Sequence, residues 1–397
     1  MRATVLITDG EQRAALAAVR ALGRMGHRVL VASGRDRSLA GASRYAVADL
    51  RVPDPLAQPL DFVGALERIV QVRAIDVLVP LTDAALLAVL AERARFAPCR
   101  IPFPDLDRVR AVGNKADVLR AAQEVGIAIP AQRVVASPGE LASVDLVGLA
   151  YPLVLKPARS VADLVNGGRQ KLSVRHAANP DELRGRLDAL PPSAYPLLLQ
   201  QRIVGPGVGI FLLPWSNGLV ATFAHRRIRE KPPSGGVSVY RESIAADPKL
   251  VACSLALLRR FAWEGVAMVE FKLDATTGVP YLMEINGRFW GSLQLAIDAG
   301  VNFPGMLVSL ALGEHPAPVT AYRIGVRSRW WLGDLDQLLA QLRHSSGELA
   351  LPPGSRGRAR ALLDFLTLWR PGDRNEIFRW SDPMPAIRET VEWMQGR

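Results

Sequence analysis

The sequence has few cysteines, few lysines and no long apolar run. Its two cysteines, Cys99 and Cys253, lie far apart without metal-ligand spacing, which argues against a disulfide framework or a zinc site and fits a reducing compartment. No stretch approaches the roughly 18 consecutive apolar residues of a membrane-spanning helix. The first residues, MRATVLITDG, lack the charged and apolar regions of a signal peptide. We therefore expect a cytoplasmic location.

Arginine supplies most of the positive charge, and the net charge is +11. Because arginine is spread along the chain without a dense basic run interleaved with aromatic residues, we expect no nucleic-acid partner. The hydrophobic content of 49% is ample for packed cores. Lysine is scarce, so a lysine at a strand end or a helix start is notable; the lysines are Lys115, Lys156, Lys171, Lys231, Lys249 and Lys272.

Strands and helices alternate at the beginning of the chain. Residues 3–8 and 75–80 read as buried strands, and residues 11–26 and 60–72 show helical spacing of apolar residues. This alternation predicts a parallel sheet with helices on both faces, over residues 1–105. The first turn, TDGEQRAA, is not GxGxxG, so a dinucleotide fingerprint is absent. The favoured interpretation is a domain that binds nothing alone.

Two lysines occupy positions that suit an anion. Residues 106–130 predict two helices ending at Gly126, with Lys115 near the start of the second helix, where backbone N–H groups attract anions. The alternative is a solvated helix lysine. The apolar strand YPLVLK, residues 151–156, delivers Lys156 to its carboxyl end, where it would place a fixed positive charge beside a ligand site.

Glycine-rich segments follow both of these lysines. The loop 159–168 contains Ser160, Gly167 and Gly168, and its backbone amides suit phosphate oxygens, although a Gly-Gly pair is more often a hairpin turn. Residues 197–213 predict apolar strands around GPGVG, and the backbone of such a hinge can hydrogen-bond an adenine edge.

An arginine-rich strand is expected within residues 222–243. Arg227 and Arg229 alternate, so we expect them on one strand face with His225, and Arg226 on the opposite face. The arginines and the Gly-Gly turn indicate an anion site, for a substrate carboxylate or a γ-phosphate. His225 by itself is more often structural than a ligand.

Residues 266–274 and 279–292 predict a hairpin that carries two acids and an amide. If the hairpin folds about residue 277, Glu270 and Glu284 lie opposite each other, with Cβ atoms about 5 Å apart. Asn286 follows two residues later and shares their face. Oxygen-only ligands suit Mg²⁺ instead of zinc or copper. The alternative is a solvated acidic strand face.

The character of the chain changes after a helix expected at 250–263 and another at 293–312. From about residue 316 it is rich in tryptophan: Trp330, Trp331, Trp369, Trp380 and Trp393. The favoured interpretation is that these side chains pack this segment onto the core. The alternative is contact with a lipid or glycolipid surface.

Together, the pieces over roughly residues 1–315 resemble the ATP-grasp superfamily, and more closely its carbamoyl-phosphate-synthase-like branch of predicted carboxylate–amine ligases. The motif ExNxR with an acid about 14 residues upstream is the most specific part. The resemblance implies an α/β and α+β fold. Its parts would be a pre-ATP-grasp domain over 1–105, an ATP-grasp domain over 106–315 (a lid at about 130–200 and a metal-binding part at about 203–315), and a C-terminal extension over 316–397.

The resemblance also implies roles for the residues named above. Lys115 and Lys156 would contact the α- and β-phosphates of ATP, and the loop with Ser160, Gly167 and Gly168 would close over the γ-phosphate. Arg288 would stabilise the transferring phosphoryl group or the acyl phosphate. The implied metal ligands for two Mg²⁺ ions, with Mn²⁺ as an alternative, are Glu270, Glu284 and Asn286, and Glu284 would bridge them. The implied adenine contacts are the backbone groups of Gln200, Gln201, Arg202 and Ile203.

One departure from the family is Gln201, where a Glu is common, which leaves the ribose-binding residue undetermined. The substrate pocket is expected around Arg227, Arg229, Ser234, Gly235 and Gly236. The implied function is an ADP-forming ligase that joins a small-molecule carboxylate to an amine or, less favoured, a thiol, and a homodimer is compatible with it. Two alternatives stay open: a nucleotide-binding module without ligase chemistry, and a membrane-associated enzyme acting on a lipid or polysaccharide intermediate.

Overall fold

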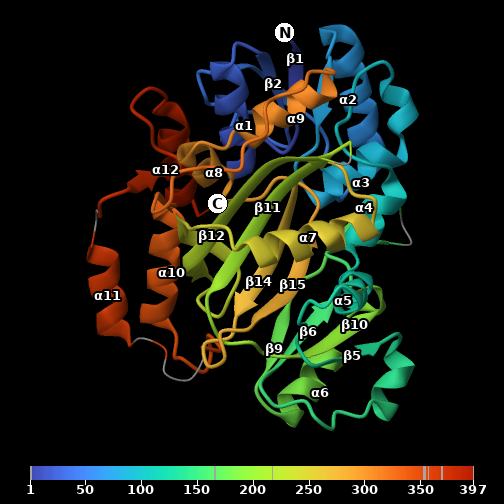
Figure 1. Cartoon of the computed structure of the whole chain (residues 1–397), viewed down its shortest axis with the longest axis vertical. Coiled ribbons are helices and arrows are strands. Elements are labelled where there is room, and N and C mark those ends of the chain that lie inside the picture. Colours follow the sequence, from blue (N-terminus) through green and yellow to red (C-terminus); the bar gives the residue numbers. More distant parts are fainter. Residues whose placement is uncertain are drawn as a thin grey trace.

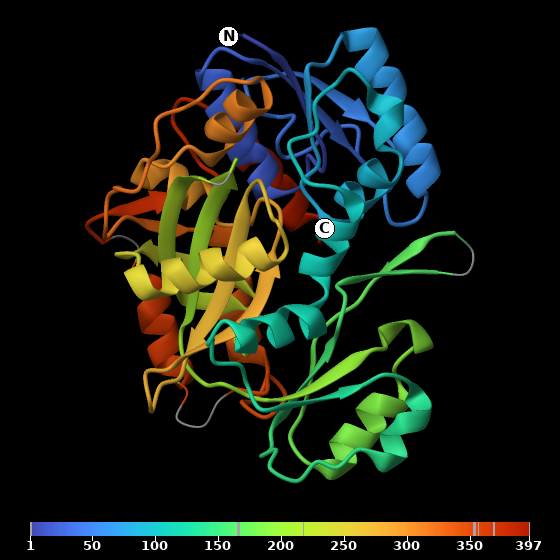
Figure 2. The ribbon, with the colours of Figure 1, turned by 45° about the vertical axis from the view of Figure 1, so that its right-hand side comes forward.

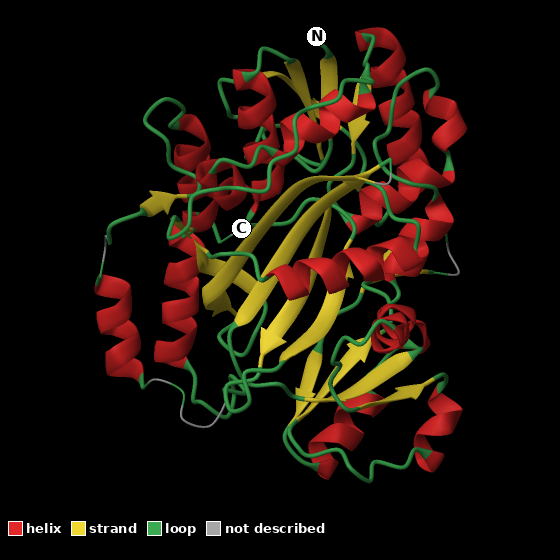
Figure 3. Cartoon of the chain, viewed as in Figure 1, coloured by secondary structure: helices red, strands yellow, loops and turns green. Residues whose placement is uncertain are grey.

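The protein is described by a computed structural model, which covers residues 2–164, 167–216, 218–351, 355, 357–367 and 370–396. Three sheets organise it, with helices packed around them (Figures 1 and 3). The first is a four-stranded parallel sheet of order β3-β2-β1-β4. Its strands are β1 (Thr4–Ile7), β2 (Arg28–Ser33), β3 (Ala46–Arg51) and β4 (Val77–Val79).

Helices alternate with these strands, as the sequence predicts. They are α1 (Arg13–Arg24), α2 (Pro59–Arg73) and α3 (Asp83–Ala91), followed by the short 3-10 helix η1 (Arg93–Phe96). The side chain of Thr82 caps α3 by accepting a hydrogen bond from the N–H of Ala85. The predicted parallel α/β part is therefore confirmed as a fold, and its boundary at residue 105 stays a prediction.

Two consecutive helices lead away from the parallel sheet. They are α4 (Leu106–Gly113) and α5 (Lys115–Glu124). The break between them occurs at Asn114, whose side chain caps α5 by accepting a hydrogen bond of 3.1 Å from the N–H of Ala116. Lys115 is thus the first residue of α5, where the sequence predicted a helix start.

The second sheet, which we call the lid sheet, is antiparallel, with the order β5-β10-β6-β9. Its strands are β5 (Gln132–Val135), β6 (Leu153–Pro157), β9 (Arg175–Ala177) and β10 (Leu197–Gln201). The elements that accompany it are η2 (Pro138–Ser143), α6 (Pro180–Asp188), η3 (Pro192–Ala194) and the hairpin of β7 (Val161–Asp163) and β8 (Arg169–Lys171). Side chains such as Leu153 and Leu197 form a core separate from the main one.

The third sheet, the large sheet, has the order β15-β14-β11-β12-β13-β16-β17. Its strands are β11 (Gly207–Trp215), β12 (Gly218–Lys231), β13 (Val237–Ser243), β14 (Ala267–Leu273), β15 (Pro280–Asn286), β16 (Arg327–Arg329) and β17 (Asp373–Asn375). Helix α7 (Pro248–Arg260) crosses one face of it (Figure 1). The buried residues of the large sheet and of the parallel sheet belong to one continuous core.

The single helix expected over residues 293–312 is wrong. The structure has two helices, α8 (Leu293–Ala299) and α9 (Phe303–Ala311). Gly300 ends α8 with a φ of +115°, a left-handed conformation that glycine adopts without a Cβ penalty. Asn302 then caps α9 by accepting a hydrogen bond from the N–H of Gly305.

Among the described residues, no single helix has the length and apolar character to cross a membrane. Helices α8 and α9 pass that test only as a pair, and the pair is bent by 94°.

The C-terminal segment is built into the large sheet, since β16 pairs with β13 and β17 pairs with β16. Its helices are α10 (Trp331–Arg343), α11 (Arg358–Leu366) and α12 (Met384–Met394). The indole N–H of Trp330 donates to Glu389 at 2.6 Å and that of Trp393 to Asp336 at 2.8 Å, which supports the packing interpretation. Trp380 is 90% exposed, and Trp369 lies outside the described residues.

A buried ion pair anchors this segment to α1. Arg20 Nε lies 2.8 Å from Asp382 Oδ2, and both residues are 1% exposed. Asp382 also accepts hydrogen bonds from the Ser43 hydroxyl at 2.7 Å and the Arg44 N–H at 2.9 Å. A buried charge needs such a set of partners, because its desolvation is otherwise uncompensated.

We expect Asp382→Asn to lower the free energy of unfolding by about 3–5 kcal/mol, because it leaves the buried Arg20 guanidinium without a counter-charge. Urea denaturation followed by circular dichroism measures it. The matched control is Asp36→Asn, whose partner Arg51 is 68% exposed, and we expect a loss below about 1 kcal/mol. Equal losses in the two variants would contradict the anchoring role.

Candidate active site

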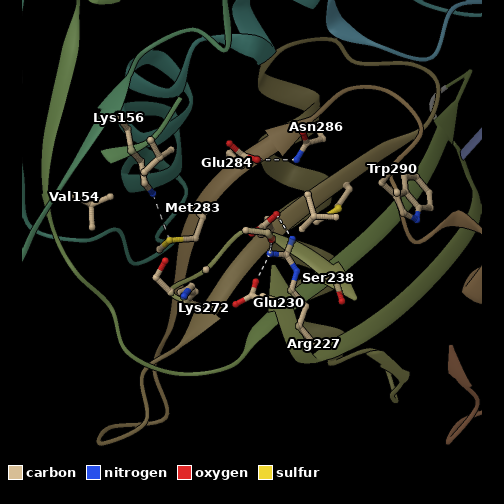
Figure 4. A pocket seen from close by; sticks show the side chains of 18 of the residues that line it. Val154, Lys156, Arg227, Glu230, Ser238, Lys272, Met283, Glu284, Asn286 and Trp290 are labelled. Atoms are coloured by element: carbon tan, nitrogen blue, oxygen red, sulfur yellow. Dashed lines mark hydrogen bonds and ion pairs between the residues drawn. The ribbon is translucent and has the colours of Figure 1, made fainter. Parts of the chain in front are cut away.

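A cavity of about 480 Å³ lies between the lid sheet and the large sheet. The lid sheet contributes Val154, Lys156 and Gln200, and β14 and β15 contribute Glu270, Glu284 and Asn286. Most of the sequence-predicted site residues therefore meet at one place, although they come from separate sheets. Figure 4 shows the lid residues Lys156 and Val154 on one side of Glu284 and Asn286, and Trp290 on the other.

The acidic hairpin has the predicted register. Glu270 pairs with Glu284 across β14 and β15, and a β-bulge follows at once, so that Phe271 pairs with Leu282 and Met283 is the extra residue. Asn286 Nδ2 donates a hydrogen bond of 3.1 Å to Glu284 Oε1. The opposition of the two acids is confirmed, and their role as metal ligands stays a prediction.

Positive side chains from three elements balance the two acids. Arg227, from β12, lies with Nη2 2.5 Å from Glu270 and with Nη1 2.7 Å from Glu230. Lys115 Nζ lies 3.4 Å from Glu284 Oε2. Burial raises the pKa of Glu270, and the charge of Arg227 opposes that rise. Burial also acts to raise the pKa of Glu284, but Lys115, Asn286 and Lys156 together lower it to about 2.

The two predicted phosphate-binding lysines converge on Glu284 from different elements. Lys115 is 7% exposed, and its Nζ donates a 2.9 Å hydrogen bond to the Ser160 hydroxyl. Lys156 leaves the carboxyl end of β6, and its Nζ lies 3.8 Å from the Met283 sulfur. Desolvation lowers the pKa of Lys156 to about 8, although the charge of Glu284 acts to raise it.

The donor set fits Mg²⁺ by its chemistry. Glu270 and Glu284 carry hard carboxylate oxygens and Asn286 an amide oxygen, the ligand type that Mg²⁺ prefers. The charge of Glu284 raises the pKa of Glu270, so a cation between them would relieve a real repulsion. Over the described part of the chain, no group of three or more His, Cys, Asp or Glu residues that could hold a metal ion is found.

The hinge predicted to hold adenine lines the cavity. Gln200, Gln201, Arg202 and Ile203 all face it. Gln200 and Gln201 still belong to β10, and the N–H of Gln201 donates to the carbonyl oxygen of Ala131 at 2.8 Å. Arg202 and Ile203 lie beyond the end of β10, so their backbone groups are the better candidates for hydrogen bonds to a base.

None of the described residues of the predicted glycine loop lines the cavity. The N–H of Leu164 donates to the carbonyl oxygen of Gly168 at 2.8 Å, which makes the Gly-Gly pair part of the β7–β8 hairpin turn. Figure 2 shows this hairpin extending away from the lid sheet, and the N–H of Arg169 donates to Leu56 of the parallel domain. Ser160 contacts Lys115 instead of lining the cavity. Residues 165 and 166 lie outside the described residues.

The expectation that Arg227 and Arg229 share one strand face is wrong. Register shifts occur between Arg227 and Arg229 and again between Arg229 and Glu230, so the alternation of faces is interrupted. Glu230 takes the place beside Arg227, and Arg229 pairs with Asp334 of α10, with Nη2 2.5 Å from Oδ2.

Ser234, Gly235 and Gly236 do line the cavity, close to two arginines. The carbonyl oxygen of Ser234 accepts from Arg202 Nη2 at 3.1 Å, and that of Gly236 accepts from Arg227 Nη1 at 3.0 Å. The carbonyl groups of the turn thus accept hydrogen bonds from both arginines, and the role of the turn in a substrate site stays a prediction.

Arg288 connects the hairpin to the parallel domain. Its Nε and Nη2 lie 2.8 and 2.9 Å from the two carboxylate oxygens of Asp83, the first residue of α3, and Nη2 also donates to the side-chain oxygen of Asn286 at 3.2 Å. Burial acts to lower the pKa of Arg288, but the charge and hydrogen bonds of Asp83 act to raise it. The pKa stays above its ordinary value, so the guanidinium stays charged. The parallel domain thus positions a predicted catalytic side chain.

Several residues of the cavity wall were not identified from the sequence. They include Arg13, Lys171, His176, Glu230, Met268, Lys272 and Trp290. The sequence contained two signals that could have identified Lys272. Lysine is scarce, and Lys272 follows Glu270 by two residues in β14, so the two side chains share a face. Arg13 carried no such signal, because it reaches the cavity from α1, far away in the sequence.

Comparisons with known proteins identify the fold of the chain. A family model described as "ATP-grasp in the biosynthetic pathway with Ter operon" matches residues 193–332. The search of curated proteins finds no match. Among solved structures, an L-amino acid ligase from Bacillus licheniformis matches with a TM-score of 0.60 at 16% identity, covering 78% of this chain and 74% of the ligase.

Two further structures are similar to the chain. Biotin carboxylase from Campylobacter jejuni, in complex with β-γ-ATP, has a TM-score of 0.63 at 15% identity and covers 82% of this chain and 74% of the carboxylase. An ADP complex of N5-carboxyaminoimidazole ribonucleotide synthetase has a TM-score of 0.64 at 16% identity, with 86% and 85% covered. At these identities the likeness shows the fold alone, so the ATP-grasp fold inferred from the sequence is confirmed.

We expect Lys156 to lose its proton near pH 8 in the ligand-free protein, because burial lowers its pKa to about 8. We expect Glu284→Gln to lower this pKa further, because the Glu284 charge acts to raise it. The ¹³Cε shifts of labelled lysine, assigned with Lys156→Arg, measure both values. Titration near the ordinary value of about 10.4, unaffected by Glu284→Gln, would contradict the arrangement.

Proposed function

We propose that this chain, which has the ATP-grasp fold, is an ATP-dependent ligase that joins a small-molecule carboxylate to an amine and forms ADP and phosphate. One observation carries the proposal. Glu270 and Glu284 oppose each other in the cavity wall, and the positive charges of Lys115 and Lys156 both act on Glu284. A solvated acidic strand face would not bring the lysines of α5 and β6 to the same carboxylate.

The chemistry follows from charge. A carboxylate and a nucleoside triphosphate repel each other, so the site must neutralise the phosphate oxygens before the two can approach. Lys115 and Lys156 would contact the α- and β-phosphates, and Arg288, held by Asp83, would face the transferring phosphoryl group. Mg²⁺ ions would add positive charge at the phosphate oxygens, and their ligands would be Glu270, Glu284 and Asn286.

The reaction would proceed in two steps. A carboxylate oxygen of the acid substrate forms a bond to the γ-phosphorus while the bond to the β,γ-bridging oxygen breaks, which gives an acyl phosphate and ADP. The lone pair of the amine then attacks the acyl carbon, the bond to phosphate breaks, and the amine nitrogen loses a proton. Exclusion of water during this interval prevents loss of the acyl phosphate by hydrolysis.

The names of the similar structures support this reading. One is an amino acid ligase, and the other two were solved with ATP-type or ADP ligands. Two Mg²⁺ ions, with Glu284 as the bridge, and adenine at the Gln200–Ile203 hinge belong to the proposal. A homodimer and a cytoplasmic location stay predictions. The alternative, a nucleotide-binding module without ligase chemistry, would bind MgATP and form no ADP with any pair of acid and amine.

We expect Glu284→Ala to lower the rate of ADP formation at least about 100-fold, equivalent to about 2.7 kcal/mol, because it removes a proposed metal ligand and a counter-charge of Lys115. A coupled assay over a panel of carboxylates and amines with MgATP measures the rate. The control is Asp181→Ala on α6, where the acid is 96% exposed. Full ADP release by the folded Glu284→Ala protein would contradict the metal assignment.

We expect Lys156→Met to weaken binding of MgADP about 10- to 100-fold, because a charge-assisted hydrogen bond contributes about 1.5–3 kcal/mol and the methionine keeps the apolar stem. Isothermal titration calorimetry measures the dissociation constant. Lys249→Met, at an exposed position of α7, is the matched control and should bind like the parent protein. An unchanged affinity in Lys156→Met would remove this lysine from the nucleotide site.

A further inference from the structure

The cavity continues past the acidic hairpin to an end that the proposed nucleotide contacts do not use. This end is bounded by Met268 of β14, by Trp290 and Gly291 after β15, and by Arg13 at the start of α1. Figure 4 shows Trp290 on the far side of Glu284 and Asn286 from Lys156. Met268 is 4% exposed and Trp290 3%, so this end has an apolar wall and one guanidinium. Ser292, next to Gly291, and His225, whose Nδ1 lies 3.3 Å from the Ser292 hydroxyl, also line the cavity.

Arg13 is held rigidly, yet part of its hydrogen-bonding capacity is unused. Its Nη1 lies 2.6 Å from Glu376 Oε2, and its guanidinium stacks 3.9 Å from the ring centre of Trp330. Within the described residues, Nε and Nη2 have no hydrogen-bond acceptor. Position 291 leaves room beside them, since a Cβ atom there would lie 3.1 Å from Nη2.

The other arginines of the cavity wall are committed to partners. Arg227 is paired with Glu270 and Glu230, and Arg288 is paired with Asp83. Arg202 donates from Nη1 and Nη2 to the carbonyl oxygens of Ala350 and Ser234. Arg13 therefore has donors available for a ligand without breaking an existing ion pair.

Arg13 also shares its counter-ion. Arg13 and the fully buried Arg241 both pair with the carboxylate of Glu376. The charge of Asp298 also acts on Arg241, and burial raises the pKa of Glu389, which accepts a hydrogen bond from Trp330. An anion at this end of the cavity would give Arg13 a counter-charge that it does not share.

We propose that this end is a subsite for a carboxylate group that is bound but not activated, carried by a substrate whose apolar part lies against Met268 and Trp290. The inference rests on the proposed function, in which the carboxylate that is phosphorylated lies beside Glu284 and Arg288. The carboxylate at the Arg13 subsite is a different group, which is bound and does not react. An amino acid used as the amine substrate and a dicarboxylic acid used as the acid substrate both provide such a group.

The test compares matched ligands by calorimetry on the MgADP-bound protein. One arm pairs apolar L-amino acids with the amines that lack their α-carboxylate. The other pairs dicarboxylic acids of about four to seven carbons with their monoamides. We expect at least one carboxylate-bearing member to bind at least about tenfold more tightly than its counterpart, because a guanidinium–carboxylate pair is charge-assisted. The arm that shows the preference identifies which substrate carries the group.

Three variants test the assignment to Arg13. Arg13→Gln should abolish the preference, and so should Gly291→Ala, which keeps Arg13 and its pair with Glu376 but fills the space beside Nη2. Arg24→Gln, at an exposed position of the same helix, should retain it. Thermal melts check that each variant is folded.

The proposal is overturned if the parent protein prefers no carboxylate-bearing ligand, or if folded Arg13→Gln and Gly291→Ala keep the preference. Neither outcome contradicts the proposed ligase function. That function is contradicted by a different result, namely that the parent protein does not bind MgADP or does not form ADP. Intact MgADP binding by Arg13→Gln together with a lost preference supports the subsite specifically.

Discussion

The structure depends on the repulsion between Glu270 and Glu284, which the register of β14 and β15 forces to face each other. Like charges directly opposite in a sheet are unfavourable unless positive groups come close. Here the positive groups come from β12, α5 and β6, through Arg227, Lys115 and Lys156. Three separate parts of the chain thus supply the positive charge around one pair of acids.

The same constraint explains how the parts of the molecule are connected. The parallel sheet and the large sheet share one apolar core, which also includes Leu198 of the lid sheet. Other lid-sheet residues, such as Leu153 and Leu197, form a second core. Lys156 is carried by the lid sheet and Glu284 by the large sheet, so electrostatic attraction acts between units that share little of their apolar cores. A polyphosphate between them would add negative charge where both units offer lysine, which is how a nucleotide could hold them together.

The C-terminal segment contributes to the site from behind. Glu376 follows β17 and holds Arg13, and Asp382 holds Arg20 of the same helix α1. Two ion pairs therefore fix α1 relative to the large sheet, to which β16 and β17 belong. The segment that the sequence marked only by its tryptophans also holds a cavity arginine, Arg13, through the carboxylate of Glu376.

The sequence by itself determined the local elements: the alternation of strands and helices, the break at Asn114, and the hairpin that opposes Glu270 with Glu284. These follow from hydrophobic period, capping residues and turn residues, which act over a few positions. Only the tertiary structure decided that Arg229 leaves the face of Arg227, that the β7–β8 hairpin contacts the parallel domain through Arg169, and that Arg13 reaches the cavity. A β-bulge changes the face of every later side chain, and contacts between distant segments depend on the packing of whole sheets, so neither is encoded in the spacing of neighbouring residues.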